Sequence, residues 1–211
     1  MMPSAEEFRQ ALIERHSLPI YETLRASRAA IAGLGGLGSN IAVALARAGV
    51  GELLLVDCDR VELSNLNRQQ YDTADLGRFK TEALRDHLLR INPYLSVSFR
   101  TVRVTPDNAV EIFGGYGIVC EAFDRADAKA MLINTLLGQC PQMRIVSGSG
   151  MAGTLSANAI TTRRVFGRLY LCGDGVSDMD EAAGLMAPRV AVCANHEAHM
   201  ALRLMLGETD A

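Results

Sequence analysis

The fold of this chain is decided by residues 28–70, RAAIAGLGGLGSNIAVALARAGVGELLLVDCDRVELSNLNRQQ. The short apolar run near its start, residues 29–32, predicts a buried parallel strand. Directly after it come Gly33, Gly35 and Gly38 in the spacing G-x-G-x-x-G. This pattern is typical of a turn between a strand and a helix at which the backbone approaches a phosphate.

The following residues place the glycine turn in a strand–helix–strand unit. A helix is expected to start at Ser39-Asn40 and to end at Gly49, a common helix stop. A second apolar strand, residues 53–56, ends in an acid 19 residues after the last motif glycine, where it is placed to bind a ribose hydroxyl. A turn that serves packing alone is the alternative. The predicted nucleotide-binding residues of this unit are Gly33, Gly35, Gly36, Gly38 and Asp57.

The kind of nucleotide depends on the residues after the second strand. The polar segment DRVELSNLNRQQ, residues 59–70, leaves the end of the strand at which ligands lie in doubly wound sheets. It supplies Arg68, and Lys80 comes twelve residues later at the start of another amphipathic helix. Two cations directed into one crevice do not suit hydride transfer, but they suit a triphosphate whose α-phosphate is attacked. Asp59 and Asn65 are also predicted to contact the nucleotide, with capping of the local turn as the alternative for Asn65.

These motifs resemble the ThiF/HesA/MoeB family, the prokaryotic relatives of the ubiquitin-activating enzymes. The resemblance rests on DCDRVELSNLNRQ after GLGGLG, on the lysine beyond it, and on INPYL at residues 91–95. It covers about residues 24–206 and looks closest for short ThiF-like proteins of thiamine biosynthesis, which carry EAFD (121–124) and GSGMAG (148–153) in similar positions. Pattern and resemblance together predict an α/β fold. It is Rossmann-like and doubly wound, with a mostly parallel sheet and additional antiparallel strands near the C-terminal part.

The resemblance implies an adenylyltransferase that uses ATP and Mg²⁺. Its implied catalytic residues are Arg68, Lys80 and Asp124, with Asp124 as the Mg²⁺ ligand. The acceptor would be the C-terminal glycine carboxylate of a ubiquitin-like sulfur carrier protein of the ThiS type, which ends in Gly-Gly. Its attack on the α-phosphate would release pyrophosphate, and no strong base is needed because a carboxylate is already ionised at pH 7. A homodimer is implied as well, and a MoaD-type carrier is the alternative partner.

Four charged residues lie in or near the strand predicted at residues 117–122. Asp124 lies just past the end of that strand, where Asp is a favoured N-cap for the next helix and also a hard oxygen donor for Mg²⁺. Asp127 and Lys129 are expected to be solvated helix residues, and the role of Glu121 stays open.

Composition fits one cytoplasmic domain. A chain of 211 residues with 49% hydrophobic residues can bury a sizeable core. We divide it into an N-terminal helical arm, residues 1–27, and an ATP-binding domain, residues 28–211. No apolar run approaches the ~20 residues that cross a bilayer, the first ten residues do not form a secretory signal, and the net charge of −3 gives no reason to expect nucleic acid.

The five cysteines form no C-x-x-C pair, so neither a disulfide framework nor a structural zinc is expected. Cys58, Cys120 and Cys193 are expected to be small core residues. Cys172 is placed in a flexible loop, CGDG, as an ordinary thiol. A covalent link from Cys172 to the carrier, as formed by a loop cysteine in some relatives, is the alternative.

Both ends of the chain are predicted to be helical. Residues 4–15 and 20–27 form the arm, and the resemblance implies that an arginine of the arm, Arg9 or Arg15, reaches the phosphates of a second subunit. Residues 190–206 form a long amphipathic helix whose His196 and His199 are expected at the surface or an interface. Between the ends, helices are predicted at 79–90, 107–113 and 125–137, and strands at 96–104, 117–122, 144–147, 156–162 and 164–172.

Three other functions remain open. The glycine motif and the ribose-binding acid also suit an NAD(P)-dependent oxidoreductase, but no hydride-transfer acid is evident and the two cations would be unexplained. A binding module that acts only in a hetero-oligomer is disfavoured by the intact set Arg68, Lys80 and Asp124. Activation of a non-protein carboxyl group, as in the related enzyme that cyclises a tRNA base, is disfavoured by the lack of a marked basic balance.

Overall fold

The computed structural model describes residues 2–177 and 184–211. In chain order its elements are α1 (Ala5–His16), α2 (Leu18–Ala26), β1 (Arg28–Ala32), α3 (Gly36–Arg47), β2 (Glu52–Asp57), the 3₁₀ turns η1 (Leu63–Asn65) and η2 (Thr73–Asp75), α4 (Lys80–Ile91), β3 (Ser96–Thr101), α5 (Pro106–Phe113), β4 (Ile118–Glu121), α6 (Ala126–Gln139), β5 (Arg144–Gly148), the 3₁₀ turn η3 (Ala157–Ala159), β6 (Thr161–Phe166), β7 (Leu169–Gly173) and α7 (Ala187–Met205). None of the helices described is both long enough and apolar enough to span a bilayer.

The strands form one seven-stranded sheet in the order β3-β2-β1-β4-β5-β7-β6. Every neighbouring pair is parallel except β6 and β7, which form an antiparallel hairpin at one edge. The predicted fold class is therefore confirmed, including the antiparallel strand near the C-terminal part. Because β1 pairs with β2 on one side and β4 on the other, the strand order reverses between β1 and β4, which is where doubly wound sheets bind ligands.

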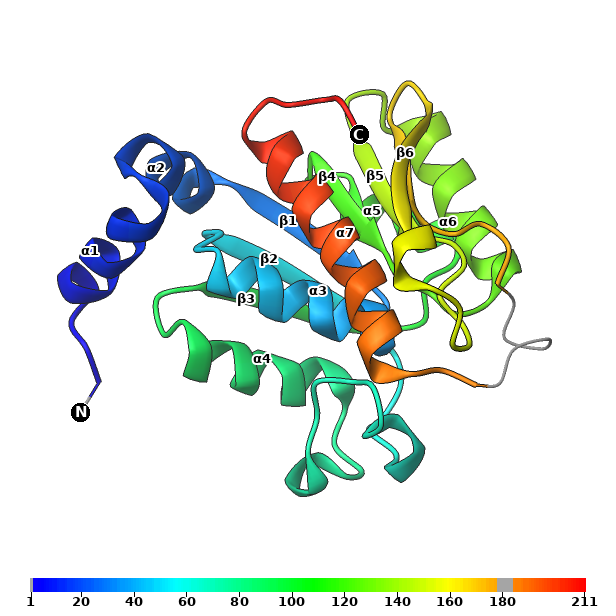
Figure 1. The fold of residues 1–211 in the computed structure, drawn as a ribbon, viewed down its shortest axis with the longest axis horizontal. Helices are drawn as coiled ribbons and strands as arrows, with labels where there is room; N and C mark the ends of the chain where they lie inside the picture. Colours follow the sequence, from blue (N-terminus) through cyan, green and yellow to red (C-terminus); the bar gives the residue numbers. More distant parts are fainter. Residues whose placement is uncertain (1, 178–183) are drawn as a thin grey trace.

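Helices cover both faces of the sheet, as the apolar composition of its central strands requires (Figure 1). On one face α3, α4 and α7 pack over a core that includes Ile31, Leu55 and Cys120. On the other face α5 and α6 pack over a second core that includes Val56 and Val119. Alternate residues of each central strand enter opposite cores, because successive side chains of a strand point to opposite faces.

The arm formed by α1 and α2 lies at the amino ends of the strands (Figure 1). None of the residues of α1 is buried, and α2 buries only Leu24. Contact with the main body includes the rings of Phe8 and Tyr94, whose centroids are 5.8 Å apart, and a hydrogen bond of 2.6 Å from the Tyr94 hydroxyl to the Pro3 carbonyl. The division between arm and domain at residue 28 remains a proposal.

Three predicted elements differ from those found. The first helix of the nucleotide-binding unit begins at Gly36 rather than Ser39, so the glycines form its first turn. The strand expected at 156–162 is mostly the 3₁₀ turn η3, and the strand expected at 164–172 is split by a turn into β6 and β7. In the second segment apolar residues continue on both sides of the turn, so the pattern does not reveal where one strand ends and the next begins. Other predicted elements are found with ends shifted by a few residues.

Candidate active site

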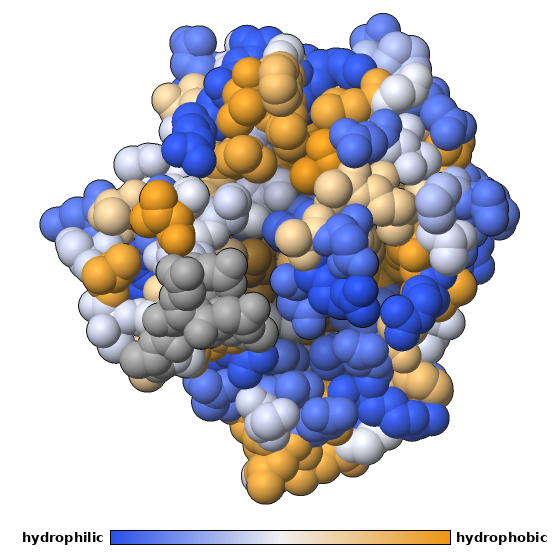
Figure 2. All heavy atoms as spheres, turned by 90° about the vertical axis from the view of Figure 1, so that its right-hand side faces the viewer, coloured by the Kyte–Doolittle hydropathy of each residue, from blue (hydrophilic) through white to orange (hydrophobic). Residues whose placement is uncertain are grey.

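A cavity of about 750 Å³ opens at the carboxyl ends of the strands, at the reversal point between β1 and β4. Figure 2 looks onto this side of the molecule and shows a central hollow with hydrophilic residues beside it. The glycine turn, the segment after β2, the start of α6 and the loop after β5 all line the cavity. The predicted site residues that line it are Gly33, Gly35, Gly36, Asp57, Asp59, Asn65, Arg68, Lys80 and Asp124.

Tight backbone packing fixes the glycine wall, which we define as residues 33–38. Gly33 has φ +89°, and a Cβ there would lie 2.8 Å from the Ala122 carbonyl oxygen. Gly38 does not line the cavity, and a Cβ on it would overlap the Gly33 carbonyl oxygen. Gly35 differs, because its added Cβ would meet only the Gln69 amide, at 3.7 Å. Since Gly35 is also the N-cap of α3, it places an open stretch of backbone and the unpaired N–H groups of a helix start beside the cavity.

Asp57 joins the glycine wall to the segment after β2. Its Oδ2 accepts a hydrogen bond of 2.6 Å from the Leu34 N–H, and its Oδ1 accepts one of 2.8 Å from the Asp59 N–H. Each oxygen keeps a further lone pair, so the predicted hydrogen bond to a ribose hydroxyl remains compatible with both contacts. The structure therefore adds a second role that the motif does not reveal, which is to fix the conformation of the turn.

Lys80 and Asp59 form an ion pair at the cavity wall. The Lys80 Nζ lies 3.2 Å from the Asp59 Oδ2, and Lys80 is 6% exposed. The Lys80 N–H also donates to the Asp59 carbonyl, and a short bridge between Arg60 and Phe79 holds the start of α4 against the segment after β2. The Lys80 ammonium group is thus held next to the Asp59 carboxylate. A bound phosphate would compete with this carboxylate for the ammonium group.

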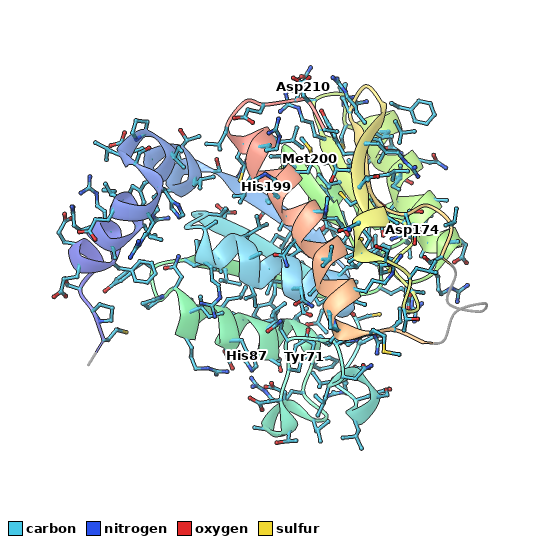
Figure 3. The ribbon with its side chains drawn as sticks, viewed as in Figure 1. Tyr71, His87, Asp174, His199, Met200 and Asp210 are labelled. Atoms are coloured by element: carbon cyan, nitrogen blue, oxygen red, sulfur yellow. The ribbon has the colours of Figure 1, made fainter. Side chains whose placement is uncertain are left out.

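Residues 58–79, which we call the crossover segment, carry Arg68 and are anchored at several points. The Tyr71 hydroxyl donates a hydrogen bond of 2.8 Å to the Leu34 carbonyl of the glycine wall. The buried Asp75 pairs with Arg78 and with His87 of α4, at 3.0 and 2.8 Å. Figure 3 shows Tyr71 and His87 near this segment, at the lower edge of the sheet. These contacts connect the position of Arg68 to both the glycine wall and α4.

The Arg68 guanidinium uses part of its donor capacity within the crossover segment. Its Nη1 donates to the Ser64 carbonyl at 3.2 Å and to the Asn67 Oδ1 at 2.8 Å. The Asn40 amide of α3 donates to the Arg68 carbonyl at 3.1 Å and so fixes its backbone. The Asn65 Oδ1 accepts a hydrogen bond from the Glu62 N–H, so the capping role considered for Asn65 is observed, although Asn65 also lines the cavity.

Asp124 suits the predicted magnesium ion better than Asp57 and Asp59, which also line the cavity. It is exposed, lines the cavity, and makes no hydrogen bond or ion pair with any residue that the structure describes. The predicted N-cap role is wrong, because α6 starts at Ala126 with Arg125 as its N-cap. The ligand atoms of Asp57, Cys58 and Asp59 also lie within 4.8 Å of one another. However, both of these carboxylates are already engaged, and a thiol is a soft ligand that Mg²⁺ does not favour.

Sequence reasoning missed two polar groups in the cavity wall. Gln69 is 8% exposed, lines the cavity, and its Oε1 has no hydrogen-bond partner among the described residues. Lys129 also lines the cavity and pairs at 2.9 Å with the fully buried Glu121, whose Oε2 accepts a hydrogen bond of 2.6 Å from Ser147. Lys129 is therefore not the solvated residue that was expected. A signal was present for Gln69, which directly follows Arg68 in the motif, but none indicates that Glu121 and Lys129 meet.

The cysteine and histidine predictions are partly wrong. Cys172 lies in β7 rather than in a loop and is fully buried, and this burial, reinforced by the nearby Glu197, raises the pKa of its thiol to about 12. A thiol with this pKa is not a nucleophile at neutral pH. Cys120 and Cys193 are core residues as expected, but Cys58 is half-buried and lines the cavity. His199 is exposed, whereas the His196 Nδ1 is hydrogen-bonded to the Thr162 hydroxyl at 3.0 Å.

Fold and site together define a nucleotide-binding α/β protein with a cationic and acidic cavity at the reversal of its sheet. Its sequence matches the ThiF family over residues 8–211, and the chain belongs to this family. The resemblance found from the motifs is thereby confirmed.

Individual relatives carry the names of adenylyltransferases. The chain is 31% identical to molybdopterin-synthase adenylyltransferase of Salmonella typhimurium over 206 residues, which cover 93% of this chain and 80% of that protein. It is 34% identical to the adenylyltransferase and sulfurtransferase UBA4 of Eremothecium gossypii over 220 residues, which cover 97% of this chain but 48% of that protein. The chain thus spans about half the length of UBA4. The predicted class of enzyme, an adenylyltransferase, is confirmed by these relatives.

The fold is also found in a solved enzyme of similar size. The crystal structure of E. coli tRNA N6-threonylcarbamoyladenosine dehydratase, TcdA, in complex with ATP matches with a TM-score of 0.86 over 98% of both chains. The two sequences are 22% identical, so this likeness establishes the fold and not the substrate.

Proposed function

We propose that this chain adenylates the C-terminal glycine carboxylate of a ubiquitin-like carrier protein, using ATP and Mg²⁺. The observation that carries the proposal is the meeting of Arg68, Lys80 and Asp124 with the glycine wall in one cavity at the reversal of the sheet. These residues come from three separate segments, and a dinucleotide-dependent oxidoreductase would leave all three without a role. Their joint position is what a triphosphate with a bound metal ion requires.

In this proposal ATP lies over the glycine wall, with its ribose on Asp57 and its phosphates beside Arg68 and Lys80. A carboxylate oxygen of the acceptor attacks the α-phosphorus as the bond to the bridging oxygen of the β-phosphate breaks. The electron pair of that bond leaves with pyrophosphate, and the acceptor becomes an acyl-adenylate. The acceptor is already ionised at neutral pH, so catalysis consists of positioning and charge stabilisation. Mg²⁺ at Asp124 would neutralise phosphate charge when it is bound.

Arg68 and Lys80 divide the work of charge stabilisation. Among the described residues, the Nε and Nη2 donors of Arg68 have no hydrogen-bond acceptor, and the planar guanidinium fork suits phosphate oxygens. Lys80 is already oriented by Asp59 at 3.2 Å, and binding of a triphosphate would draw the ammonium group toward the phosphates. Gln69 is proposed as a further contact of the nucleotide, because its buried oxygen has no partner among the described residues and costs free energy until a ligand donates to it.

The proposed partner is a carrier of the ThiS type, which ends in Gly-Gly, in thiamine thiazole biosynthesis. The end of β5 and the loop after it support an extended acceptor without side chains, because four of the five residues 148–152 that line the cavity are small, Met151 being the exception. The Salmonella relative is named for molybdopterin synthase, so a MoaD-type carrier is the main alternative. A carboxyl group on a tRNA base is the second alternative, suggested by the name of the matching TcdA structure.

A homodimer is proposed on the position of the arm. Arg9 and Arg15 belong to α1, at the amino ends of the strands, whereas the cavity lies at their carboxyl ends. Neither arginine therefore reaches the cavity of its own chain, and an arginine of the arm would act only on a second copy. Arg9 is engaged with Glu6 and lies over the Tyr21 ring, which leaves Arg15 as the better candidate.

The experiment that tests this function is ATP–pyrophosphate exchange with purified carriers. We expect exchange that depends on a ThiS-type carrier and is lost when its last glycine is removed. Exchange with a MoaD-type carrier alone would retain the reaction and change the partner. Tight ATP binding without exchange would contradict a carrier as the acceptor and direct the search to tRNA. Binding of NAD(H) in place of ATP would contradict the proposed reaction altogether.

A further inference from the structure

A single buried arginine joins three segments that border the cavity. Arg189, in the first turn of α7, has a side chain that is 5% exposed. It forms an ion pair with the Asp174 Oδ2, and the Asp174 side chain is 3% exposed. Its Nη1 also donates to the carbonyls of Leu155 and Ser156, and its Nη2 donates to the Ser177 hydroxyl at 3.3 Å. We call Arg189 and Asp174 the clasp.

The clasp connects three segments that are far apart in the sequence. Asp174 follows β7, Leu155 follows β5, and Arg189 begins the last helix. Figure 3 shows Asp174 beside β6 at this side of the molecule. The Asp174 Oδ1 accepts hydrogen bonds of 2.9 and 2.8 Å from the N–H groups of Val176 and Ser177. One carboxylate therefore fixes a turn through one oxygen and the arginine through the other.

The same segments form what we call the acceptor wall, residues 148–152 with Ser177 and Leu185, all of which line the cavity. Backbone hydrogen bonds run from the clasp into this wall. The Asp174 N–H donates to the Gly150 carbonyl and the Gly175 N–H to the Ser149 carbonyl, both at 3.0 Å. A side chain on Gly150 would overlap the Asp174 carboxylate, so loop and clasp are in van der Waals contact.

The acceptor wall also contacts the crossover segment directly, and the glycine wall is not part of this contact. The Asn67 amide donates to the Leu185 carbonyl at 3.1 Å, and the Asn67 Oδ1 accepts from the Arg68 guanidinium at 2.8 Å. Leu185 lies four residues before the clasp arginine. The loop after β5 is therefore the part of the cavity that the clasp contacts directly, whereas Arg68 is held within its own segment by Ser64 and Asn67.

We infer that the Arg189–Asp174 clasp is the positioning element that holds the acceptor wall in place for the incoming carboxylate, and that it does not take part in ATP binding. The inference rests on the proposed function for the identity of the acceptor. Neither clasp residue lines the cavity, so both act through the backbone of residues 148–156 and 174–177. A displacement of about 1 Å in such a wall is enough to lower a rate by ~10²-fold, because attack needs aligned reactants.

The test compares Arg189→Met and Asp174→Asn with Arg164→Met. Arg164 is an exposed arginine of β6 that bonds only the Gly167 carbonyl of its own hairpin among the hydrogen bonds described, so it is the matched control. For both clasp variants we expect kcat/KM for the carrier to fall roughly tenfold or more while the Kd for ATP is unchanged. Arg189→Lys keeps the charge but cannot reach the carboxylate and both carbonyls together, so its effect should be intermediate.

A second readout is independent of any acceptor. In both clasp variants, compared with the wild type, amide hydrogen exchange of the ATP-bound enzyme should be faster in peptides covering 148–156 and 172–177. It should be unchanged in peptides covering 33–38. If Arg189→Met does not fold, Asp174→Asn and Arg189→Lys carry the same two measurements. Equal losses for ATP and carrier, or faster exchange spread over the whole domain, would overturn the inference in favour of a general stabilising role. If the wild type shows no ATP–pyrophosphate exchange, only the proposed function is contradicted. Amide hydrogen exchange would still test whether the clasp holds the acceptor wall in place.

Discussion

The two walls of the cavity reach a fixed shape by different physical means. The glycine wall is one continuous stretch, and its shape follows from close contacts that only glycine permits, at Gly33 and Gly38. The acceptor wall is assembled from separate segments and depends on the side chains of Arg189 and Asp174. In the glycine wall, substitution is excluded at Gly33 and Gly38 by backbone contacts alone. The acceptor wall also contains close-packed glycines, Gly148 and Gly150, but it needs the buried ion pair of the clasp in addition.

The largest expected effect is that of Gly38→Ala. The added methyl group would overlap the Gly33 carbonyl oxygen, so either the turn or the start of α3 must move. We expect a loss of about 3 kcal/mol or more in the free energy of unfolding and loss of ATP binding. Urea unfolding and ATP titration measure both.

The control is Gly138→Ala near the end of α6, where nothing lies near an added Cβ. Alanine has the higher helix propensity, so this variant should be as stable as the wild type or more so. A Gly38→Ala protein with normal stability and normal ATP affinity would contradict the account of the glycine wall.

Arg68→Ala should have the next largest effect, on rate rather than stability. Loss of a donor to the transition state should lower the rate of adenylation by at least ~10²-fold. Arg47→Ala, which removes an exposed arginine from the last turn of α3, is the control and should leave the rate unchanged. Pyrophosphate exchange at saturating ATP and carrier is the measurement, and an Arg68→Ala rate near that of wild type would exclude Arg68 from the catalytic group.

Glu197 lies beneath both walls and gives a test based on pH. It is fully buried, its oxygens have no partner among the described residues, and it approaches Gly148 of the acceptor wall, where Leu37 of the glycine wall also makes contact. Burial raises the pKa of this carboxyl well above its ordinary value; Lys129 opposes the shift and Glu121 adds to it. The folded protein therefore keeps this proton to a higher pH than the unfolded chain does.

Below pH 4.5, the ordinary value for this group, the carboxyl is protonated in the folded and the unfolded state alike. As the pH rises further, the unfolded chain releases the proton and the folded protein retains it, so the free energy of unfolding falls by up to about 1.4 kcal/mol per pH unit. Glu197→Gln should remove this fall and be more stable than wild type at pH 7 but not at pH 4. Glu111→Gln, an exposed change on α5, is the control. Parallel pH curves for wild type and Glu197→Gln would contradict the prediction.

The smallest effect is expected for Cys172→Ala. This thiol lies in β7 next to the acceptor wall, and its pKa of about 12 keeps it protonated. Adenylation should proceed at the wild-type rate, and iodoacetamide should modify the half-buried Cys58 before Cys172 in the folded protein. A covalent adduct between Cys172 and the carrier, found by mass spectrometry under non-reducing conditions, would reverse this conclusion.

Prediction from sequence worked best where the decisive contacts lie close together along the chain. The glycine spacing, the apolar runs on both sides of it and Asp57 all belong to one strand–helix–strand unit, and they predicted the parallel sheet and the position of the cavity. Arg68, Lys80 and Asp124 were predicted from their positions after predicted strands together with a resemblance, and they are brought to one cavity, although their roles remain proposals. The assignment of Cys172 to a loop was wrong because its strand pairs with β5, at Gly148. The assignment of Lys129 to solvent was wrong because Lys129 folds back from α6 onto Glu121 at the end of β4, a contact that no local pattern indicates.

The sequence by itself determined the strand–helix–strand unit, because glycine sterics and apolar periodicity act over a few residues and need no partner from elsewhere. Only the tertiary structure decided which polar groups become buried together. Arg189 meets the carbonyl of Leu155, 34 residues before it, and Glu121 meets both Ser147 and Lys129. Pairing of buried charges depends on the desolvation of both groups in the folded chain, and that is a property of the packed core and not of any local pattern.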